Sequence, residues 1–249
     1  MKLTVVGCSG SFPGPDSAAS CYLVEHDGYH LVLDLGSGAL GPLQRHVRLD
    51  DVDAVWVSHL HADHCADLCG FYVARKYCPT PVDRAPLPVF GPQSTRRLIA
   101  GAYGGISEDH LSEVFTFHTV TAGRRTVGPF TVTAARTAHP VECYAVRLEA
   151  GGRVLVYTGD TGPSQAVAAL AAGADLLLAE ASFVTGAPNP ADLHLTGEQA
   201  GALAQTAGAT RLVLTHVPPW HDPDQARREA TTSYDGPVEL AVSSATYLL

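Results

Sequence analysis

The sequence lacks a long apolar run and is short of positive charge. No stretch approaches the roughly 20 apolar residues that a membrane-spanning helix needs, and a strand pattern starts at Leu3 without a signal peptide before it. We therefore expect a soluble, cytoplasmic protein with no membrane partner. The chain has 16 Lys and Arg against 25 Asp and Glu, a formal net charge of -9. This balance disfavours long nucleic acids as partners, because binding them needs a basic face that displaces counterions from phosphates.

Cysteine pairs with C-x-x-C spacing are also missing. The six cysteines are scattered along 249 residues, 46% of which are hydrophobic, so the chain can bury a sizeable core without disulfides. We expect reduced thiols and a single domain over residues 1–249. Cys65 and Cys69 are one helical turn apart and could face a metal site, but burial as small apolar side chains is the favoured interpretation.

The sequence does contain a dense group of metal-ligand side chains, at residues 58–67 (SHLHADHCAD). His59 and His61 follow a strand-like run, and residues two apart on extended backbone lie on one face, so both can point at one ion. A helix predicted over residues 63–77 would turn Asp63 and His64 toward a second ion. Nitrogen and oxygen ligands suit a borderline divalent cation, with zinc first and manganese or iron as alternatives.

Further ligand-type side chains stand at the ends of later strand-like segments. His139 would be the third ligand of the first ion, and Asp160, in the turn TGDTG, could approach two cations at once. Glu180 and His216 also end strands. Strands that alternate with helices, with ligands along one edge, indicate an α/β fold with layered sheets.

The periodic patterns predict six helices and eleven strands. The predicted strands cover residues 2–6, 21–24, 30–33, 53–57, 87–90, 130–135, 144–148, 153–157, 175–179, 211–214 and 238–242, and the helices residues 39–46, 63–77, 93–100, 164–172, 199–207 and 223–233.

Three other features have two interpretations each. Residues 7–17 (GCSGSFPGPDS) are predicted to be an irregular loop that either offers backbone N–H groups to a phosphate or only connects strands. Asp34 either orients a metal-binding histidine or caps a turn. Trp220 either stacks against a nucleotide base or packs its own loop.

These motifs resemble the metallo-β-lactamase superfamily. The resemblance rests on HLHADH, on His139, on GDT at residues 159–161 and on LTH ending at His216. Within the superfamily, AEAS at residues 179–182 and HLT at residues 194–196 are similar to the HEAT and HST loops of ribonuclease Z. The resemblance implies an αββα sandwich of two mixed sheets flanked by helices. It also implies two metal ions, one on His59, His61 and His139, one on Asp63, His64 and His216, with Asp160 bridging both.

Two departures separate the chain from tRNA-trimming ribonuclease Z enzymes. Those enzymes carry a long arm between the positions of His139 and Asp160, where this chain has room only for a tight hairpin, and Ala179 replaces the first histidine of HEAT. A closer resemblance, carried by GCSGS, LQRH, SHLHADHCADL, AHP, GDTG, DLHL and LTHVPPW, is to actinobacterial proteins described as atypical class II cyclic-nucleotide phosphodiesterases.

This resemblance implies a dinuclear metal-dependent phosphodiesterase that hydrolyses 3′,5′-cyclic nucleotides, cAMP first, to nucleoside monophosphates. In the mechanistic hypothesis, Asp63 orients and deprotonates the nucleophile, and His194, oriented by Glu180, protonates the leaving oxygen. In the competing interpretation Asp63 is only a ligand, Glu180 is a buried, paired acid and His194 is a loop histidine.

Other functions stay open at this point. They are tRNA 3′-end cleavage, hydrolysis of a thioester or lactone on the same scaffold, and a metal-bound sensor or scaffold without chemistry. The partner expected first is a small phosphodiester such as a cyclic nucleotide, and the family resemblance favours a homodimer.

Overall fold

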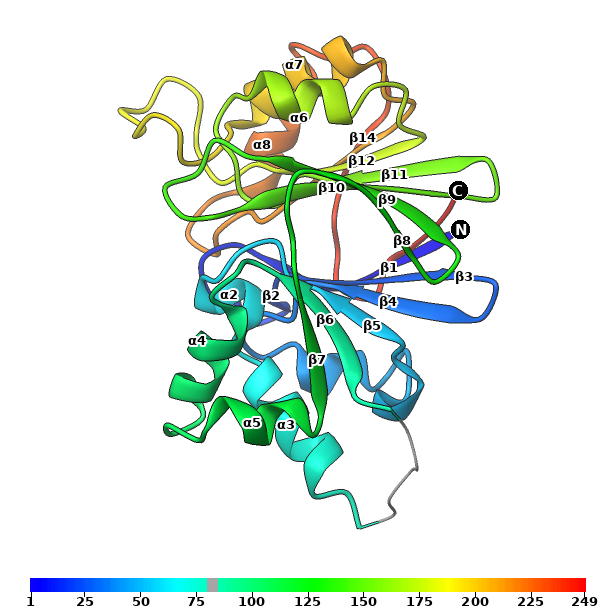
Figure 1. Ribbon diagram of the computed structural model, residues 1–249. Coiled ribbons are helices and arrows are strands. Elements are labelled where there is room, and N and C mark those ends of the chain that lie inside the picture. Colours follow the sequence, from blue (N-terminus) through cyan, green and yellow to red (C-terminus); the bar gives the residue numbers. More distant parts are fainter. Residues whose placement is uncertain (80–84) are drawn as a thin grey trace.

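Two β-sheets lie face to face, with helices on both outer sides (Figure 1). The structure is a computed structural model that describes residues 1–79 and 85–249. Both sheets are mixed, so the α/β class and the αββα layering expected from the sequence are confirmed. In the described part of the chain, no helix is both long and apolar enough to cross a membrane.

The first sheet has the strand order β15-β1-β3-β4-β5-β6-β7, with the short β2 beside β1. Pairing from β15 to β4 is antiparallel, and pairing from β4 to β7 is parallel. The strands are β1 (Lys2–Ser9), β2 (Ala18–Ala19), β3 (Cys21–His26), β4 (Tyr29–Leu33), β5 (Ala54–Trp56), β6 (Leu87–Gly91), β7 (Phe115–Thr119) and β15 (Thr246–Leu248).

The second sheet has the order β14-β13-β12-β11-β10-β9-β8. Strands β8 to β11 are antiparallel to their neighbours, and β11 to β14 are parallel. The strands are β8 (Gly123–Val127), β9 (Phe130–Arg136), β10 (Tyr144–Ala150), β11 (Arg153–Tyr157), β12 (Leu176–Glu180), β13 (Leu212–Thr215) and β14 (Val238–Leu240).

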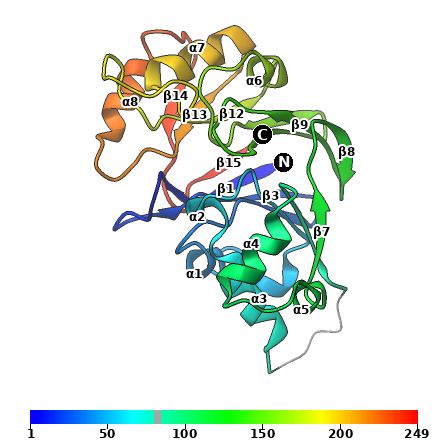
Figure 2. The same ribbon diagram turned by 60° about the vertical axis from the view of Figure 1, so that its left-hand side comes forward.

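Helices cover the outer face of each sheet (Figures 1 and 2). The first sheet is covered by α1 (Leu40–Leu43), the 3-10 helix η1 (Leu49–Asp51), α2 (Ala62–Cys65), α3 (Leu68–Lys76), α4 (Thr95–Ala102) and α5 (Glu108–Ser112). The second is covered by α6 (Gln165–Leu170), α7 (Gly197–Ala207) and α8 (Pro223–Ala230). Helix α7 starts at a capping box between Thr196 and Gln199 and ends at Gly208, which adopts the left-handed conformation.

Apolar side chains form three layers. The central layer lies between the sheets and includes the fully buried Tyr22, Trp56, Phe130 and Tyr157. A second layer joins the first sheet to its helices, and a third joins the second sheet to α6, α7 and α8. Strands in the middle of each sheet are therefore buried on both faces, which explains why β12 is the uninterrupted apolar run LLLA before Glu180.

Several predicted elements differ in extent from the observed ones, and two of these differences have a clear structural cause. The loop predicted over residues 7–17 starts only at residue 10, because β1 continues through Ser9 and pairs with β2 and β3. A Cβ on Gly7 would lie 2.0 Å from the Ala19 carbonyl oxygen, so glycine allows this pairing. The helix predicted over residues 63–77 is divided into α2 and α3, because the Asp67 N–H donates to the Leu35 carbonyl oxygen and the His64 carbonyl oxygen accepts the Leu35 N–H, which takes both groups out of the helical ladder.

Candidate metal centre

The ligand-type side chains gather where strands of both sheets reach one edge of the sandwich. In the second sheet β11, β12 and β13 are parallel, so their carboxyl ends share an edge, and Asp160, Glu180 and His216 stand there. His59 follows β5 of the facing sheet, and His139 lies three residues beyond β9. Side chains from distant parts of the chain therefore meet between the two sheets.

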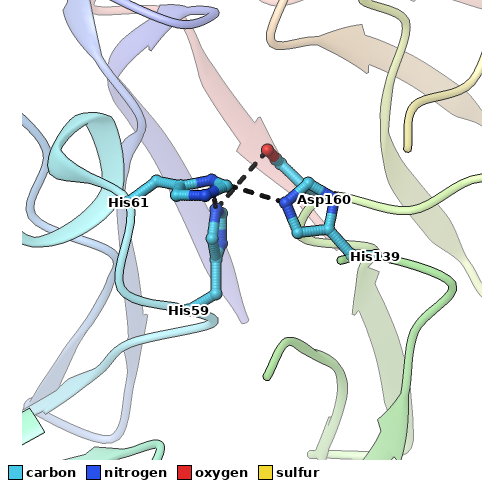
Figure 3. Close-up of side chains that lie close together, drawn as sticks. All are labelled: His59, His61, His139 and Asp160. Atoms are coloured by element: carbon cyan, nitrogen blue, oxygen red, sulfur yellow. Dashed lines mark hydrogen bonds and ion pairs between the residues drawn. The ribbon is translucent and has the colours of Figure 1, made fainter. Parts of the chain in front are cut away.

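The first ligand group contains His59, His61, His139 and Asp160 (Figure 3). The Nε2 atom of His59 is 2.9 Å from Nδ1 of His61 and 3.5 Å from Oδ2 of Asp160. Nε2 of His139 is 3.4 Å from the same Nδ1 of His61. Four donor atoms that face one another at these separations are the arrangement a four-coordinate cation requires.

The second ligand group contains Asp63, His64 and His216. Nε2 of His216 is 3.1 Å from both Nε2 of His64 and Oδ2 of Asp63. Asp160 also faces this group, because its Oδ1 atom is 3.3 Å from Nε2 of His64 and 3.6 Å from Nε2 of His216. One oxygen of Asp160 thus points to each group.

Asp34 determines which nitrogen of His64 faces the ligands. This fully buried carboxylate accepts hydrogen bonds from the Ser58 backbone N–H (2.6 Å), the Ser58 hydroxyl (2.8 Å) and the Tyr157 hydroxyl (2.7 Å), and it lies 2.7 Å from Nδ1 of His64. Nδ1 of His64 therefore carries a proton, and Nε2 would present its lone pair to a cation once the ring gives up its second proton. The Ser58 hydroxyl, which donates to Asp34, accepts from Nδ1 of His59 at 3.1 Å.

His216 and His139 are oriented in the same way from the second sheet. The Ser182 hydroxyl donates to the His216 carbonyl oxygen (2.8 Å) and accepts from Nδ1 of His216 (2.7 Å). These bonds hold His216 in the left-handed conformation, with φ 57°. Nδ1 of His139 donates to the Leu193 carbonyl oxygen at 2.9 Å. For both residues Nε2 is left to face the centre.

The chemistry of the donor set fits divalent cations. Oδ1 of Asp160 is buried and accepts no hydrogen bond from the described residues, a costly state that a cation would relieve. Burial and the neighbouring His64 hold the pKa of His59 well below its usual value, and burial also lowers the pKa of His139, so both are neutral ligands at pH 7. Burial would raise the pKa of Asp160, but the nearby His216 and His64 bring it well below its usual range.

Glu180 and His194 form a pair next to the ligands. The Glu180 carboxylate is fully buried and accepts the Thr161 backbone N–H at 2.6 Å. Nδ1 of His194 lies 3.0 and 3.1 Å from its two oxygens and 3.9 Å from Oδ2 of Asp160. Burial opposes the charged imidazolium, but the Glu180 carboxylate outweighs it and raises the pKa of His194 to about 9. Nε2 of His194 has no hydrogen-bond partner among the described residues.

The structure brings together every ligand expected from the sequence, in the two expected groups, and places Asp34 behind His64. It gives no metal role to Cys65, whose thiol donates to the His61 carbonyl oxygen and whose pKa burial raises to about 12. Cys69 lies in the layer between the first sheet and its helices. Sequence reasoning missed the supporting role of Tyr157, because nothing in a strand-end tyrosine indicates which side chain it reaches across the core.

Comparison with known proteins shows the family to which the chain belongs. The family model described as a beta-lactamase superfamily domain matches residues 29–217. The chain belongs to the beta-lactamase superfamily. Its histidine and aspartate groups fit the divalent metal site that is typical of the superfamily fold, and the chain is a metallo-hydrolase of this superfamily.

Relatives in the superfamily match along nearly the whole chain. An uncharacterized protein of Mycobacterium leprae is 43% identical over 99% of this chain and 88% of its own length. The probable metallo-hydrolase YhfI of Bacillus subtilis is 34% identical, with 98% of each chain covered. A ribonuclease Z of Mycobacterium bovis is 30% identical over 96% of this chain and 95% of its own.

Solved structures confirm the fold. The crystal structure of YhfI from Bacillus subtilis, a metallo-beta-lactamase fold protein, superposes with a TM-score of 0.88 at 32% identity and covers 99% of both chains. The short form of human tRNase Z superposes with a TM-score of 0.79 at 22% identity, covering 100% of this chain and 99% of the other. At that identity the second likeness concerns the fold alone.

Proposed function

We propose that the chain is a dinuclear metal-dependent phosphodiesterase for small substrates, with 3′,5′-cyclic nucleotides, cAMP first, as the leading candidates. The observation that carries the proposal is the Glu180–His194 pair, which puts a protonated imidazole beside the ligand groups. Hydrolysis of a phosphodiester with a ribose leaving group needs such a proton donor, because the departing oxygen must be protonated. Hydrolysis of a thioester does not need one.

The ligands would divide between two cations, with zinc proposed first and manganese or iron as alternatives. His59, His61 and His139 would hold one, Asp63, His64 and His216 the other, and Asp160 both. When bound, such a pair acidifies water and stabilises negative charge on a phosphoryl group. The protein supplies the positions of these ligands and the proton transfers around them.

His194 is placed to protonate the departing oxygen. Because its pKa is raised to about 9, the imidazole is protonated at neutral pH, and Nδ1 is engaged by Glu180, so Nε2 is the atom that can give up its proton. A ribose oxygen leaves as a poor, strongly basic group and benefits from that proton. A thiolate, with a pKa near 8.5, leaves without one.

The proposed role of Asp63 differs from that of His194. Burial alone would raise its pKa, but hydrogen bonds from His216 and His64 hold it far below the usual range for a carboxyl group. A carboxylate that is this weak a base is better suited to ligation and to orienting a water molecule than to strong general-base catalysis. We therefore assign Asp63 to ligation and to orienting the nucleophile.

The surroundings of the site favour a small substrate over tRNA. Strands β10 and β11 are joined by a tight turn at Gly151 and Gly152, so no arm extends between His139 and Asp160. Loops 10–17, 185–193 and 217–222, which flank His216 and His194, contain no Lys or Arg. A long polyanion would therefore gain little from counterion release at this edge.

Cleavage of tRNA 3′ ends is the second candidate, since a protein named ribonuclease Z is 30% identical over most of both chains. A third is hydrolysis of a thioester or lactone on the same scaffold. These candidates differ in substrate and in salt dependence, so one panel of substrates separates them.

The experiment compares the wild type with His194→Ala, and uses His110→Ala, an exposed histidine on α5, as the matched control. Zinc- or manganese-loaded protein should convert cAMP to AMP, and His194→Ala should lower the rate about 10²–10⁴-fold with bound metal unchanged. No AMP from cAMP would count against the substrate assignment.

Other outcomes of the same substrate panel would support a different function. Cleavage of precursor tRNA that falls steeply with salt would support the second candidate. Acyl hydrolysis faster than hydrolysis of bis(p-nitrophenyl) phosphate would support the third. Two bound metals without turnover of cyclic mononucleotides, cyclic dinucleotides, precursor tRNA or acyl substrates would indicate a sensor or scaffold.

A further inference from the structure

Phe12 and Trp220 form an exposed aromatic pair. Their ring centroids are 5.0 Å apart with an interplanar angle of 44°, and 41% and 63% of the two residues remain exposed. Large aromatic side chains left in water beside each other cost hydrophobic free energy, so a solvent-facing pair of this kind indicates a ligand surface.

The two loops that carry this pair adjoin the ligand group at His216. Trp220 is four residues from His216, so their Cα atoms are at most about 14 Å apart. On the Phe12 side, a Cβ on Gly10 would lie 2.2 Å from the His216 carbonyl oxygen, and the Gly10 N–H donates to Val217 at 3.2 Å. The loops 10–17 and 217–222 lie side by side in both ribbon views, blue and orange respectively (Figures 1 and 2).

Both loops are held in place by their own contacts. The Ser9 hydroxyl donates to the Phe12 carbonyl oxygen at 2.8 Å, and the His221 N–H donates to the Pro218 carbonyl oxygen at 2.9 Å, which closes a turn around Trp220. Proline restricts the backbone on either side of the pair. The two rings are therefore preorganised and lose little conformational freedom when a ligand binds.

The chemistry of the two loops specifies a flat, uncharged ligand group. Neither loop contains Lys or Arg, and together they contain Asp16 and Asp222, so they are not built to grip a second phosphate. Indole and phenyl rings stack well against nucleobases, whichever base is present. A nucleotide combines such a group with the phosphate that the adjacent metal ligands would take.

We propose that Phe12 and Trp220 form the base platform of the substrate site, with a purine stacked on the Trp220 indole and the phosphodiester at the metal ligands. The proposal rests on the proposed phosphodiesterase function. In this arrangement the base contributes to substrate binding through Phe12 and Trp220. The phosphodiester lies at the ligand groups, which are separate from these two residues.

Tryptophan fluorescence tests the platform without relying on activity. The chain has two tryptophans, and Trp56 is fully buried, so Trp220 is the exposed one. AMP should quench the fluorescence, ribose 5-phosphate, which lacks the base, should not, and Trp220→Phe should abolish the change. Equal binding of AMP and ribose 5-phosphate, or AMP binding measured by dialysis without a fluorescence change, would overturn the proposal.

Kinetics supply the second readout. Trp220→Ala should raise KM for cAMP about tenfold, with kcat within about twofold, and should leave KM for the 3′,5′-cyclic phosphate of methyl riboside unchanged. Phe12→Ala should act in the same direction, and Tyr77→Ala, another exposed aromatic residue far from these loops, should do nothing. An equal rise in KM for both substrates would also overturn the platform.

The two hypotheses fail in different ways. If AMP quenches Trp220 but no phosphodiester is hydrolysed, the platform stands and the phosphodiesterase function falls. If the base-free cyclic phosphate is hydrolysed as efficiently as cAMP, the phosphodiesterase function stands and the platform falls.

Discussion

At the scale of single residues, Asp34 is the side chain on which the second ligand group depends most. It is fully buried, accepts hydrogen bonds from three groups besides His64, and adopts a left-handed backbone conformation with φ 57°. Such conformations are uncommon outside glycine and persist only where the surroundings impose them. The strained position places a carboxylate where it fixes both the tautomer and the direction of the His64 ring.

Asp34→Asn should therefore weaken metal binding. The amide cannot accept from all the donors that now surround the carboxylate, and it no longer favours the Nδ1–H tautomer of His64. We expect metal affinity or activity to fall about 10–100-fold, measured by metal content after dialysis against buffered zinc and by phosphodiester hydrolysis. Asp109→Asn, at an exposed acid on α5, is the control and should change neither. Unchanged metal affinity in Asp34→Asn would refute the orienting role.

Glu180 should control the pH range in which His194 is protonated. Because the carboxylate raises the pKa of His194 to about 9, the proton donor is present below that pH and is lost as the pH rises through it. In Glu180→Gln the alkaline limb of kcat should move to lower pH. The pH profile of cAMP hydrolysis measures this shift, and bis(p-nitrophenyl) phosphate, whose leaving group needs no proton, should respond much less. If the alkaline limb does not move in Glu180→Gln, Glu180 does not control the pKa of His194.

At the scale of elements, the site depends on how closely the ends of β1 and β13 approach each other. The loop after β1 contacts the segment after β13 through Gly10 and Val217, and Ser9 and Val217 form an isolated β-bridge. Close backbone approach at Gly10 leaves no space for a side chain against His216. The position of this metal ligand is thus set in part by a strand from the other sheet.

Gly10→Ala should displace His216 and destabilise the fold. The added Cβ would meet the His216 carbonyl oxygen at 2.2 Å, and overpacking of this kind costs about 1–3 kcal/mol, or a decrease in Tm of about 3–10 °C. Metal affinity should fall in parallel. Gly14→Ala in the same loop is the matched control, since its Cβ would lie 3.4 Å from Pro219, an ordinary contact. Thermal unfolding and metal content measure both effects, and equal Tm values for the two variants would contradict this account.

At the scale of the whole molecule, the ligand set forms only when the two sheets are packed on each other in their native position. His59, His61, Asp63 and His64 come from the first sheet and its helix α2, whereas His139, Asp160 and His216 come from the second. The group at residues 59–64 is far from His139, Asp160 and His216 in an unfolded chain. A bound cation would therefore bind the folded state and stabilise the packing of one sheet on the other.

Removal of metal should lower thermal stability by an amount that depends on metal concentration. Free metal at about 100 times its Kd stabilises a fold by about 2.7 kcal/mol, which corresponds to about 5–10 °C in Tm for a chain of this size. Unfolding followed by circular dichroism, with chelator and then with graded zinc, manganese or magnesium, measures the change and ranks the metals. A Tm that is the same with chelator and with every metal would show that the histidines and aspartates do not bind these cations.

The sequence by itself determined the α/β class, most of the strands and the ligand-type side chains that the fold gathers into groups able to hold a cation. These are local properties: apolar runs mark strands that are buried on both faces, and ligand-type side chains after such runs are visible without knowing where the strands lie. It failed for β2, β7, β8, β15, η1 and α5, which were not predicted. Strand β8 (GRRTV) is almost entirely polar, and β2, β15, η1 and α5 have five residues or fewer, whereas the alternation FTFH in β7 was a usable signal.

Only the tertiary structure decided which atoms support the ligands and which side chains share a surface. Tyr157 reaches Asp34 across 123 residues, and Phe12 meets Trp220 across the junction of the two sheets. No periodicity encodes such pairs, because they arise when two separately formed layers close over a common core. The sequence therefore specified what could bind a metal ion, and the packing of one sheet on the other decided how each ligand is held.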